Sequence, residues 1–178
     1  MKPALFLDRD GVINKDYGYV YEIKKFEIYE DIFDIIKLFQ SRGYLVIVVT
    51  NQSGIGRGYY TLDEFLKLSE YMKSQFKKEG IAIDSIYYCD HSPEEMCECR
   101  KPNIGMIKSA CRDFDIDLKN SWMVGDKQSD IDLAKNAKIG TSVYLGDKAI
   151  EGASYSFKEL SQFKAFLDSN NDRISIKS

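Results

Sequence analysis

Short apolar runs alternate with amphipathic segments along this chain of 178 residues, and that order constrains the fold more than any other feature. Residues 44–49 form a continuous apolar and β-branched run, which is typical of a strand buried on both faces. Residues 32–39 carry apolar side chains at i, i+3, i+4 and i+7, the spacing of a helix with one buried face. The alternation predicts an α/β fold, in which helices cover both faces of a parallel sheet.

The expected elements follow one another along the chain with short connections. We predict strands at residues 4–7, 44–49, 83–88, 122–124 and 142–145. We predict helices at residues 32–39, 62–76, 104–114, 131–137 and 157–167, the second of them opened by a capping box of Thr61 and Glu64. Residues 1–168 should form one domain, and the polar tail 169–178 should be disordered.

Charge and hydropathy exclude several classes of function. The chain has 25 Lys and Arg against 28 Asp and Glu, a net charge of −3. It therefore lacks the excess of positive charge that is typical of proteins that bind nucleic acid or an anionic membrane surface. The first residues lack the apolar region of a signal peptide, and no apolar run approaches the ~20 residues that span a bilayer. We therefore expect a cytoplasmic monomer that binds neither nucleic acid nor membrane.

Polar residues stand where the expected strands end. Asp8, Thr50 with Asn51, Cys89, and Asp126 each follow an apolar run. Polar residues can simply mark the point where a strand stops. In an open parallel sheet, however, ligands bind outside the carboxyl ends of the strands, so these four groups should meet at one edge. The convergence of acids and a hydroxyl there favours a functional site.

Asp8 and Asp10 bring two carboxylates to the end of the first expected strand. A single Asp-x-Asp is usually a solvated turn, but Asp126 should arrive beside this pair from a neighbouring strand. Carboxylates this close repel one another unless a cation lies between them. An oxygen-only set of ligands suits Mg²⁺, and Mg²⁺ suits phosphate chemistry.

Two further segments could hold a phosphate group. Residues 50–54 are rich in hydroxyls and in backbone N–H groups that can cradle an anion, although they do not form a P-loop. Arg100 and Lys101 place two cations immediately before Pro102. A cation pair of this kind is commonly just solvated, and it gains interest from the segment that precedes it.

Four soft metal ligands lie within eleven residues: Cys89, His91, Cys97 and Cys99. His91 is the only histidine of the chain, so a three-histidine metal site is excluded and any histidine-based catalysis would have to use it. Three cysteines and one histidine in a reducing compartment predict a structural, four-coordinate Zn²⁺. Because Cys99 precedes Arg100 directly, this zinc loop would also fix the cations. Cys111, on an expected helix, is predicted to be an inert core residue.

Taken in order, these residues resemble the haloacid dehalogenase superfamily of phosphohydrolases. The resemblance covers almost the whole chain. It rests on Asp8-Arg9-Asp10-Gly11-Val12, Thr50-Asn51, Lys101, and Gly125-Asp126-Lys127-x-x-Asp130. It implies a Rossmann-like three-layer fold with a central parallel sheet. The interval from Gly11 to Glu30 is too short for a helical cap, so we expect no separate cap domain.

The resemblance also implies roles for individual residues. Asp8 would be the nucleophile and Asp10 the general acid and base, while Thr50 and Lys101 would stabilise the phosphoryl group. Mg²⁺ would be held by Asp8, the backbone carbonyl of Asp10 and Asp126, with Asp130 supporting these ligands. Contacts with the substrate would come from Asp16, Tyr17, Gly18, Tyr19, Asn51, Gln52, Ser53, Arg100 and Lys127.

Two branches of the superfamily contain a zinc loop, and the sequence resembles each of them in part. Residues 12–14 and 18–20 resemble the phosphatases that remove the 7-phosphate of D-glycero-D-manno-heptose 1,7-bisphosphate in the synthesis of lipopolysaccharide or other surface glycans. The five residues between His91 and Cys97 look more like histidinol-phosphate phosphatases. We favour the heptose branch. A non-catalytic zinc module is a third interpretation, against which the complete acidic set and Lys101 argue.

Overall fold

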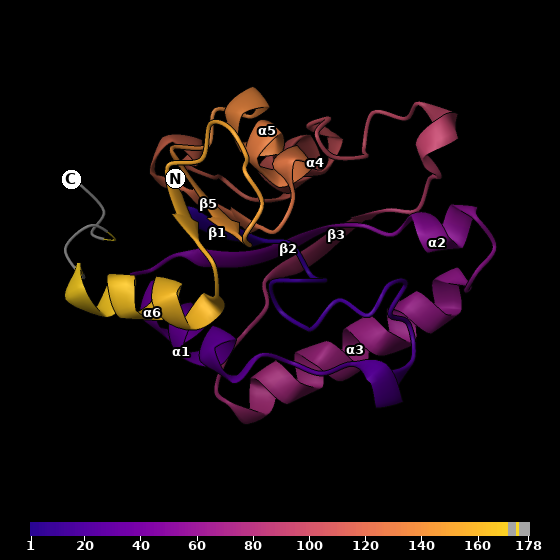
Figure 1. The fold of residues 1–178 in the computed structure, drawn as a ribbon, viewed down its shortest axis with the longest axis horizontal. Helices are drawn as coiled ribbons and strands as arrows, with labels where there is room; N and C mark the ends of the chain where they lie inside the picture. Colours follow the sequence, from indigo (N-terminus) through magenta and orange to yellow (C-terminus); the bar gives the residue numbers. More distant parts are fainter. Residues whose placement is uncertain (171–173, 175–178) are drawn as a thin grey trace.

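A six-stranded sheet forms the centre of the computed structural model, which describes residues 1–170 and 174 (Figure 1). The strand order is β3-β2-β1-β4-β5-β6, and every neighbouring pair is parallel. The strands are β1 (Ala4–Leu7), β2 (Leu45–Asn51), β3 (Ser85–Cys89), β4 (Trp122–Gly125), β5 (Thr141–Leu145) and β6 (Tyr155–Phe157). The predicted parallel α/β architecture is therefore confirmed.

Helices cover both faces of this sheet. One face carries α1 (Glu30–Ser41), α3 (Leu62–Lys78) and α6 (Leu160–Ser169), and the other carries α4 (Gly105–Asp113) and α5 (Gln128–Asn136) (Figure 1). Each face has its own core cluster, because the side chains of β1 alternate between the two sides. The remaining helical turns are α2 (Ser53–Gly56) and three 3-10 turns at Ile23–Lys25, Pro93–Glu95 and Leu118–Asn120.

Local sequence explains the best-predicted helices. The apolar stripe of α1, at Ile32, Ile35, Ile36 and Phe39, is buried as its spacing indicates. At the start of α3, Thr61 Oγ1 accepts a hydrogen bond from the N–H of Glu64 and the Glu64 carboxylate accepts one from the N–H of Thr61, at 3.2 and 2.8 Å. This arrangement is the predicted capping box.

Other boundaries differ from the predictions. The helix expected from residue 157 is preceded by the strand β6, and α6 begins only at Leu160. Tyr155 and Phe157 pack against Phe166 of that helix, with ring centroids 4.8 and 5.3 Å apart, so aromatic packing replaces the helical continuation. The helix α5 begins at Gln128 rather than at residue 131, and β2 continues to Asn51.

Two further predictions concern Cys111 and the C-terminal tail. Cys111 was expected in the core, but it is exposed, because the buried side of α4 consists of Met106, Ile107 and Ala110. The tail prediction for residues 169–178 falls mainly on residues 171–173 and 175–178, which lie outside the described residues. Ile174, which is described, is fully buried.

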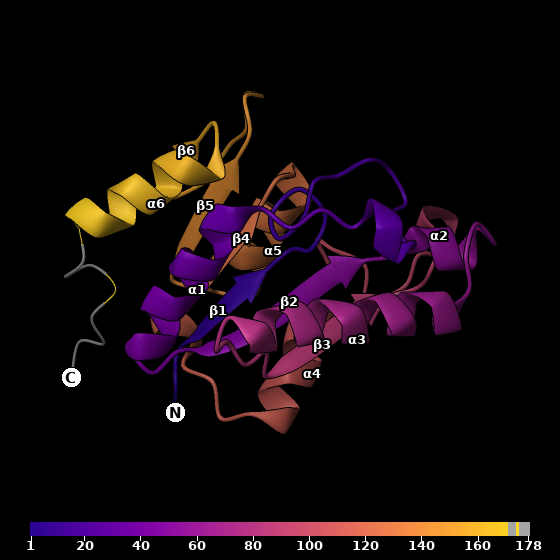
Figure 2. The ribbon, with the colours of Figure 1, turned by 90° about the horizontal axis from the view of Figure 1, so that it is seen from below.

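The connection between β1 and α1 contains one short 3-10 turn and otherwise loops, in agreement with the expected lack of a cap domain there. Figure 2 shows β1 and β2 running side by side in the same direction, so the residues after each strand meet at one edge of the sheet. None of the helices in the described part of the chain has both the length and the apolar character that a membrane span requires.

Candidate active site

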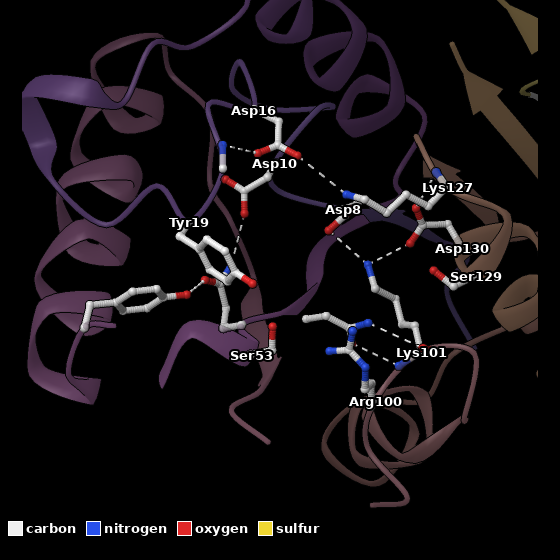
Figure 3. A pocket seen from close by; sticks show the side chains of 14 residues that line it. Asp8, Asp10, Asp16, Tyr19, Ser53, Arg100, Lys101, Lys127, Ser129 and Asp130 are labelled. Carbon is white, nitrogen blue, oxygen red and sulfur yellow. Dashed lines mark hydrogen bonds and ion pairs between the residues drawn. The ribbon is translucent and has the colours of Figure 1, made fainter. Parts of the chain in front are cut away.

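A cavity of about 370 Å³ opens at the carboxyl ends of β1, β2 and β4 (Figure 3). Most of the predicted site residues line it, including the two acids of the Asp-x-Asp motif and both cations that precede Pro102. The lining residues are Asp8, Asp10, Asp16, Gly18, Tyr19, Asn51, Gln52, Ser53, Tyr60, Arg100, Lys101, Lys127, Ser129 and Asp130.

Asp8 stands at the end of β1 and is 5% exposed. Its backbone N–H donates to the carbonyl of Val124 in β4 at 3.0 Å, which fixes the start of the loop. Its carboxylate oxygen Oδ1 lies 2.9 Å from Lys101 Nζ and accepts the N–H of Arg9 at 2.8 Å. The sheet and these donors together hold the Asp8 side chain at the cavity wall.

Lys101 lies between two carboxylates, as Figure 3 shows. Its Nζ is 2.7 Å from Asp130 Oδ1 and also donates to the carbonyl of Val49 at 3.0 Å. Burial alone would lower the pKa of Lys101, but the carboxylates of Asp130 and Asp8 outweigh it and the pKa is raised. The lysine therefore carries a permanent positive charge beside Asp8.

Asn51 fixes the backbone of the same lysine. Its side-chain amide accepts the N–H of Lys101 at 3.0 Å and donates to the carbonyl of Lys101 at 3.4 Å. A residue predicted to touch the substrate thus also attaches the segment after the zinc loop to the end of β2.

Asp126, after β4, supplies the third predicted acid. Ligand oxygens of Asp8, Asp126 and Asp130 lie within 4.8 Å of one another. Gly11 allows this approach, because a β-carbon there would lie 2.2 Å from Asp126 Oδ2. Burial, followed by the negative charge of Asp8, raises the pKa of Asp126 to about 7. An all-oxygen group with surplus negative charge fits a hard cation such as Mg²⁺.

Asp130 supports this group from within the fold. Its Oδ2 accepts the backbone N–H groups of Asp126 and Lys127, both at 3.1 Å, while Oδ1 pairs with Lys101. Both oxygens are therefore engaged by the protein. Burial raises the pKa of Asp130, and the charge of Lys101 opposes that change.

Asp10 points into the cavity and accepts hydrogen bonds from three side chains. Arg9 donates to both of its oxygens, with Nη2 at 3.0 Å from Oδ1 and 2.9 Å from Oδ2. Asn14 Nδ2 donates to Oδ1 at 3.0 Å and Gln52 Nε2 to Oδ2 at 3.2 Å. The Asp10 carboxyl group therefore has one well-defined orientation beside Asp8.

Three residues predicted for catalysis, magnesium or substrate do not line this cavity: Tyr17, Thr50 and Asp126, the last of which lines a neighbouring cavity. Tyr17 is 59% exposed, and its hydroxyl donates to Glu27, so the predicted substrate contact from Tyr17 is not supported by its position. Thr50 is buried, and its Oγ1 accepts a hydrogen bond from Gln52 Nε2 at 2.8 Å. Thr50 therefore orients Gln52 in the structure.

Four residues at or behind the cavity were missed. Tyr60 donates to Gln52 Oε1, and burial raises the pKa of Tyr60 to about 12, so its hydroxyl remains a donor. Ser129 lies beside Asp130 in the lining. Arg9 and Asn14 orient Asp10. No spacing rule in the sequence identifies Tyr60, whereas Ser129 lies inside the motif that ends at Asp130.

The four predicted zinc ligands form one cluster beside the site. Their ligand atoms lie within 4.8 Å of one another. His91 Nδ1 is 3.1 Å from Cys99 Sγ, and Cys97 Sγ is 3.4 and 3.5 Å from the sulfurs of Cys89 and Cys99, which contact each other directly. Three sulfurs and one imidazole nitrogen that lie this close together are a donor set that fits Zn²⁺.

We predict about one zinc per purified chain, because four soft ligands complete one tetrahedral site. Metal analysis gives the stoichiometry, and thiol titration of denatured protein with a chelator but no reductant should count all four cysteines. A Cys111→Ser variant should lose one thiol and keep the zinc, because Cys111 lies outside the cluster. Folded protein with no zinc and only two titratable thiols would instead indicate a disulfide between Cys89 and Cys99.

Comparison with protein families and curated proteins gives consistent relatives. A family model described as HAD-hydrolase-like matches residues 98–156. The chain is 48% identical over 165 residues to a D-glycero-alpha-D-manno-heptose-1,7-bisphosphate 7-phosphatase of Campylobacter jejuni, covering 92% of this chain and 95% of the relative. It is 44% identical over 166 residues to the corresponding beta enzyme of Helicobacter pylori, covering 93% and 95%.

Solved structures share the fold. A D,D-heptose 1,7-bisphosphate phosphatase from B. bronchiseptica, complexed with magnesium and phosphate, superposes with a TM-score of 0.80 at 26% identity, covering 95% of this chain and 99% of the other. A D,D-heptose 1,7-bisphosphate phosphatase from Burkholderia thailandensis gives a TM-score of 0.65 at 26% identity, covering 95% and 100%.

Proposed function

Because this chain belongs to the HAD-like family of heptose-1,7-bisphosphate 7-phosphatases, we propose that it hydrolyses the 7-phosphate of D-glycero-D-manno-heptose 1,7-bisphosphate. The observation that carries the proposal is the placement of Asp8, Asp10 and Lys101 in one cavity at the carboxyl ends of the strands. That arrangement supports phosphoryl transfer to a carboxylate followed by hydrolysis.

Asp8 is the proposed nucleophile. A carboxylate oxygen of Asp8 attacks phosphorus, the bond from phosphorus to the sugar oxygen breaks, and an aspartyl-phosphate forms. Lys101 lies against Asp8 Oδ1 and stays charged, so it can stabilise the negative charge of the phosphoryl group. Thr50 remains a proposed contributor to this stabilisation, through Gln52.

Asp10 is the proposed general acid and base. As an acid it gives its proton to the departing sugar oxygen. In the second step it takes a proton from the water that attacks the aspartyl-phosphate, which releases inorganic phosphate and restores Asp8. Its three hydrogen-bond donors keep the carboxyl group aimed into the cavity throughout.

Asp8, Asp126 and the backbone carbonyl of Asp10 are the groups that would hold Mg²⁺. When bound, the ion neutralises phosphoryl charge and repulsion between the acids. Asp130 is not proposed as a ligand, because Lys101 and two backbone N–H groups already occupy its oxygens.

The remaining lining residues are proposed to recognise the substrate. Arg100 has a buried Nη1 that makes no hydrogen bond with the described residues, so it can bind an anionic oxygen of the substrate. Lys127 Nζ lies 3.7 Å from Asp16 across the mouth of the cavity. The other proposed contacts are Gly18, Tyr19, Asn51, Gln52 and Ser53.

We also propose the cellular setting that follows from this activity. The product would feed the synthesis of lipopolysaccharide or other surface glycans in the cytoplasm. The chain would act there as a monomer on a small phosphorylated sugar, with residues 1–168 as its catalytic domain and a structural Zn²⁺ in the loop of residues 89–99. We propose further that the chain binds neither a membrane nor nucleic acid.

Side-by-side turnover of three substrates tests the proposed activity. The value of kcat/KM for phosphate release should be higher with heptose 1,7-bisphosphate than with histidinol phosphate. Arg100 and Lys127 line the cavity in addition to Lys101, so they can bind the second phosphate group of the sugar. Both anomers of the sugar should be measured, since the relatives act on the alpha or the beta form by name. A clear preference for histidinol phosphate would overturn the choice of substrate.

Magnesium should raise the melting temperature more at about pH 8 than at about pH 5.5, because Asp126 with a pKa of about 7 holds a proton that competes with the ion. In metal-free protein, Asp126 has the opposite effect on the pH dependence of stability. Its folded state binds this proton more tightly than the unfolded chain, whose Asp pKa is about 3.9, so this group lowers stability as the pH rises from about 4 to 7.

Thermal melts with and without MgCl₂ at the two pH values check this expectation. Asp126→Asn serves as the matched control, because the amide keeps the shape of the side chain without the titration. The variant should lose most of the magnesium response at both pH values. Equal stabilisation of the unchanged protein at the two pH values would contradict the prediction.

A further inference from the structure

Arg9 is the largest of the fully buried side chains, with 1% of its surface exposed. Its guanidinium lies between two aromatic rings, with Cζ 6.0 Å from the centroid of Phe26 and 5.8 Å from that of Phe65. A buried cation costs stability unless it is paired and hydrogen-bonded, so its presence calls for a specific partner. The roles assigned above to the acids and to Lys101 do not explain this residue.

The partner of Arg9 is the proposed general acid and base. Nη2 donates to both oxygens of Asp10 at 3.0 and 2.9 Å, and Nε lies 3.3 Å from Oδ1. The Asp10 side chain is 17% exposed, on the side of the cavity, whereas that of Arg9 is 2% exposed. The planar guanidinium therefore sets the plane of the Asp10 carboxyl group from behind.

The same Nη2 also donates to the carbonyl of Val20 at 2.6 Å. Val20 is buried and ends the segment 16–20, in which Asp16, Gly18 and Tyr19 line the mouth of the cavity. One guanidinium group thus joins the acid that handles protons to the segment that faces the substrate.

We infer that Arg9 is a positioning residue that aligns Asp10 for proton transfer and couples this alignment to the segment 16–20. The inference rests on the proposed function, because it needs a phosphorylated alcohol as substrate. It assigns Arg9 no contact with the reacting atoms. Its effect on the rates of the chemical steps should therefore be confined to the steps in which Asp10 moves a proton.

Arg9→Lys separates these steps, because lysine keeps the charge but cannot form the planar fork. The first measurement uses an aryl phosphate, whose leaving group departs without a proton. Quenched-flow experiments should show aspartyl-phosphate formation within about twofold of the unchanged protein, and its hydrolysis slower by about tenfold or more. With the sugar bisphosphate, which needs a proton on its leaving oxygen, both steps should slow by about tenfold or more.

Arg112→Lys is the matched control, because Arg112 lies on the exposed face of α4 and donates to Ser109. This variant should leave both steps unchanged. If Arg9→Lys does not fold, Phe65→Leu removes one ring that holds the guanidinium and keeps its hydrogen bonds. The same pattern with a smaller amplitude is then expected.

Equal slowing of both steps with the aryl phosphate, or no slowing of either, would overturn the inference. Failure of the proposed function would look different. The unchanged protein would then hydrolyse the aryl phosphate but not the sugar bisphosphate, and the ratio of the two aryl-phosphate steps would still report on Arg9.

Discussion

Asp8→Asn should lower the rate of phosphate release by a factor on the order of 10³ or more, because it removes the carboxylate proposed to attack phosphorus. The amide keeps the shape of the side chain, so the N–H of Arg9 and Lys101 retain an oxygen partner. The negative charge of Asp8 contributes to the raised pKa of Asp126, and its loss should leave metal-free protein as stable as before or more so.

Phosphate release, the melting temperature and mass spectrometry of acid-quenched protein check this expectation together. The unchanged protein should show a phosphorylated peptide that contains Asp8, and the variant should show none. A stably folded variant that keeps a tenth of the activity would remove Asp8 from the nucleophile's role.

Lys101→Met should lower the free energy of unfolding and abolish activity. Removing one partner of a buried charge group leaves the others uncompensated, at a cost of about 3–5 kcal/mol. Here the uncompensated groups are Asp8 and Asp130, whose side chains are 7% and 0% exposed. The charge of Lys101 opposes the raised pKa of Asp130, so without the lysine that pKa should rise further. The loss of stability should therefore be larger at about pH 8 than at about pH 5, where protonation relieves it.

A double variant separates the structural role of Lys101 from its proposed catalytic role. Lys101→Met with Asp130→Asn removes one positive and one negative charge, so denaturant unfolding should recover a large part of the lost stability. Activity should not recover, because no cation remains beside Asp8. Recovered activity in the double variant would show that Lys101 serves the fold alone.

The main lines of the fold could be predicted because they depend on local patterns. The apolar run of β1 and the stripe of α1 each determine their own structure and burial. The strand β6 was missed because three residues carry too little pattern, and their pairing depends on Phe166 and β5. Cys111 was misplaced because a small thiol fits either face of a helix, and only the packing of α4 decides between them.

The candidate site shows the same division. Asp8, Asp126 and Lys101 were predictable, because each follows a strand or a motif that places it at the edge of the sheet. Arg9 and Tyr60 were not, because they act through contacts that the fold creates, with Asp10 and Gln52. The family resemblance implies a substrate contact for Tyr17, but its side chain lies outside the cavity and donates to Glu27.

Asn51 makes two hydrogen bonds with the backbone of Lys101, and these hold the lysine at the end of β2. Cys89 ends β3, and Asn51 holds Lys101, so the intervening residues 90–98 are anchored at both ends. Substitutions at residues 92–96, between the predicted ligands His91 and Cys97, can therefore change this loop without moving Lys101. The loop can vary in sequence while the geometry around Asp8 and Lys101 stays the same.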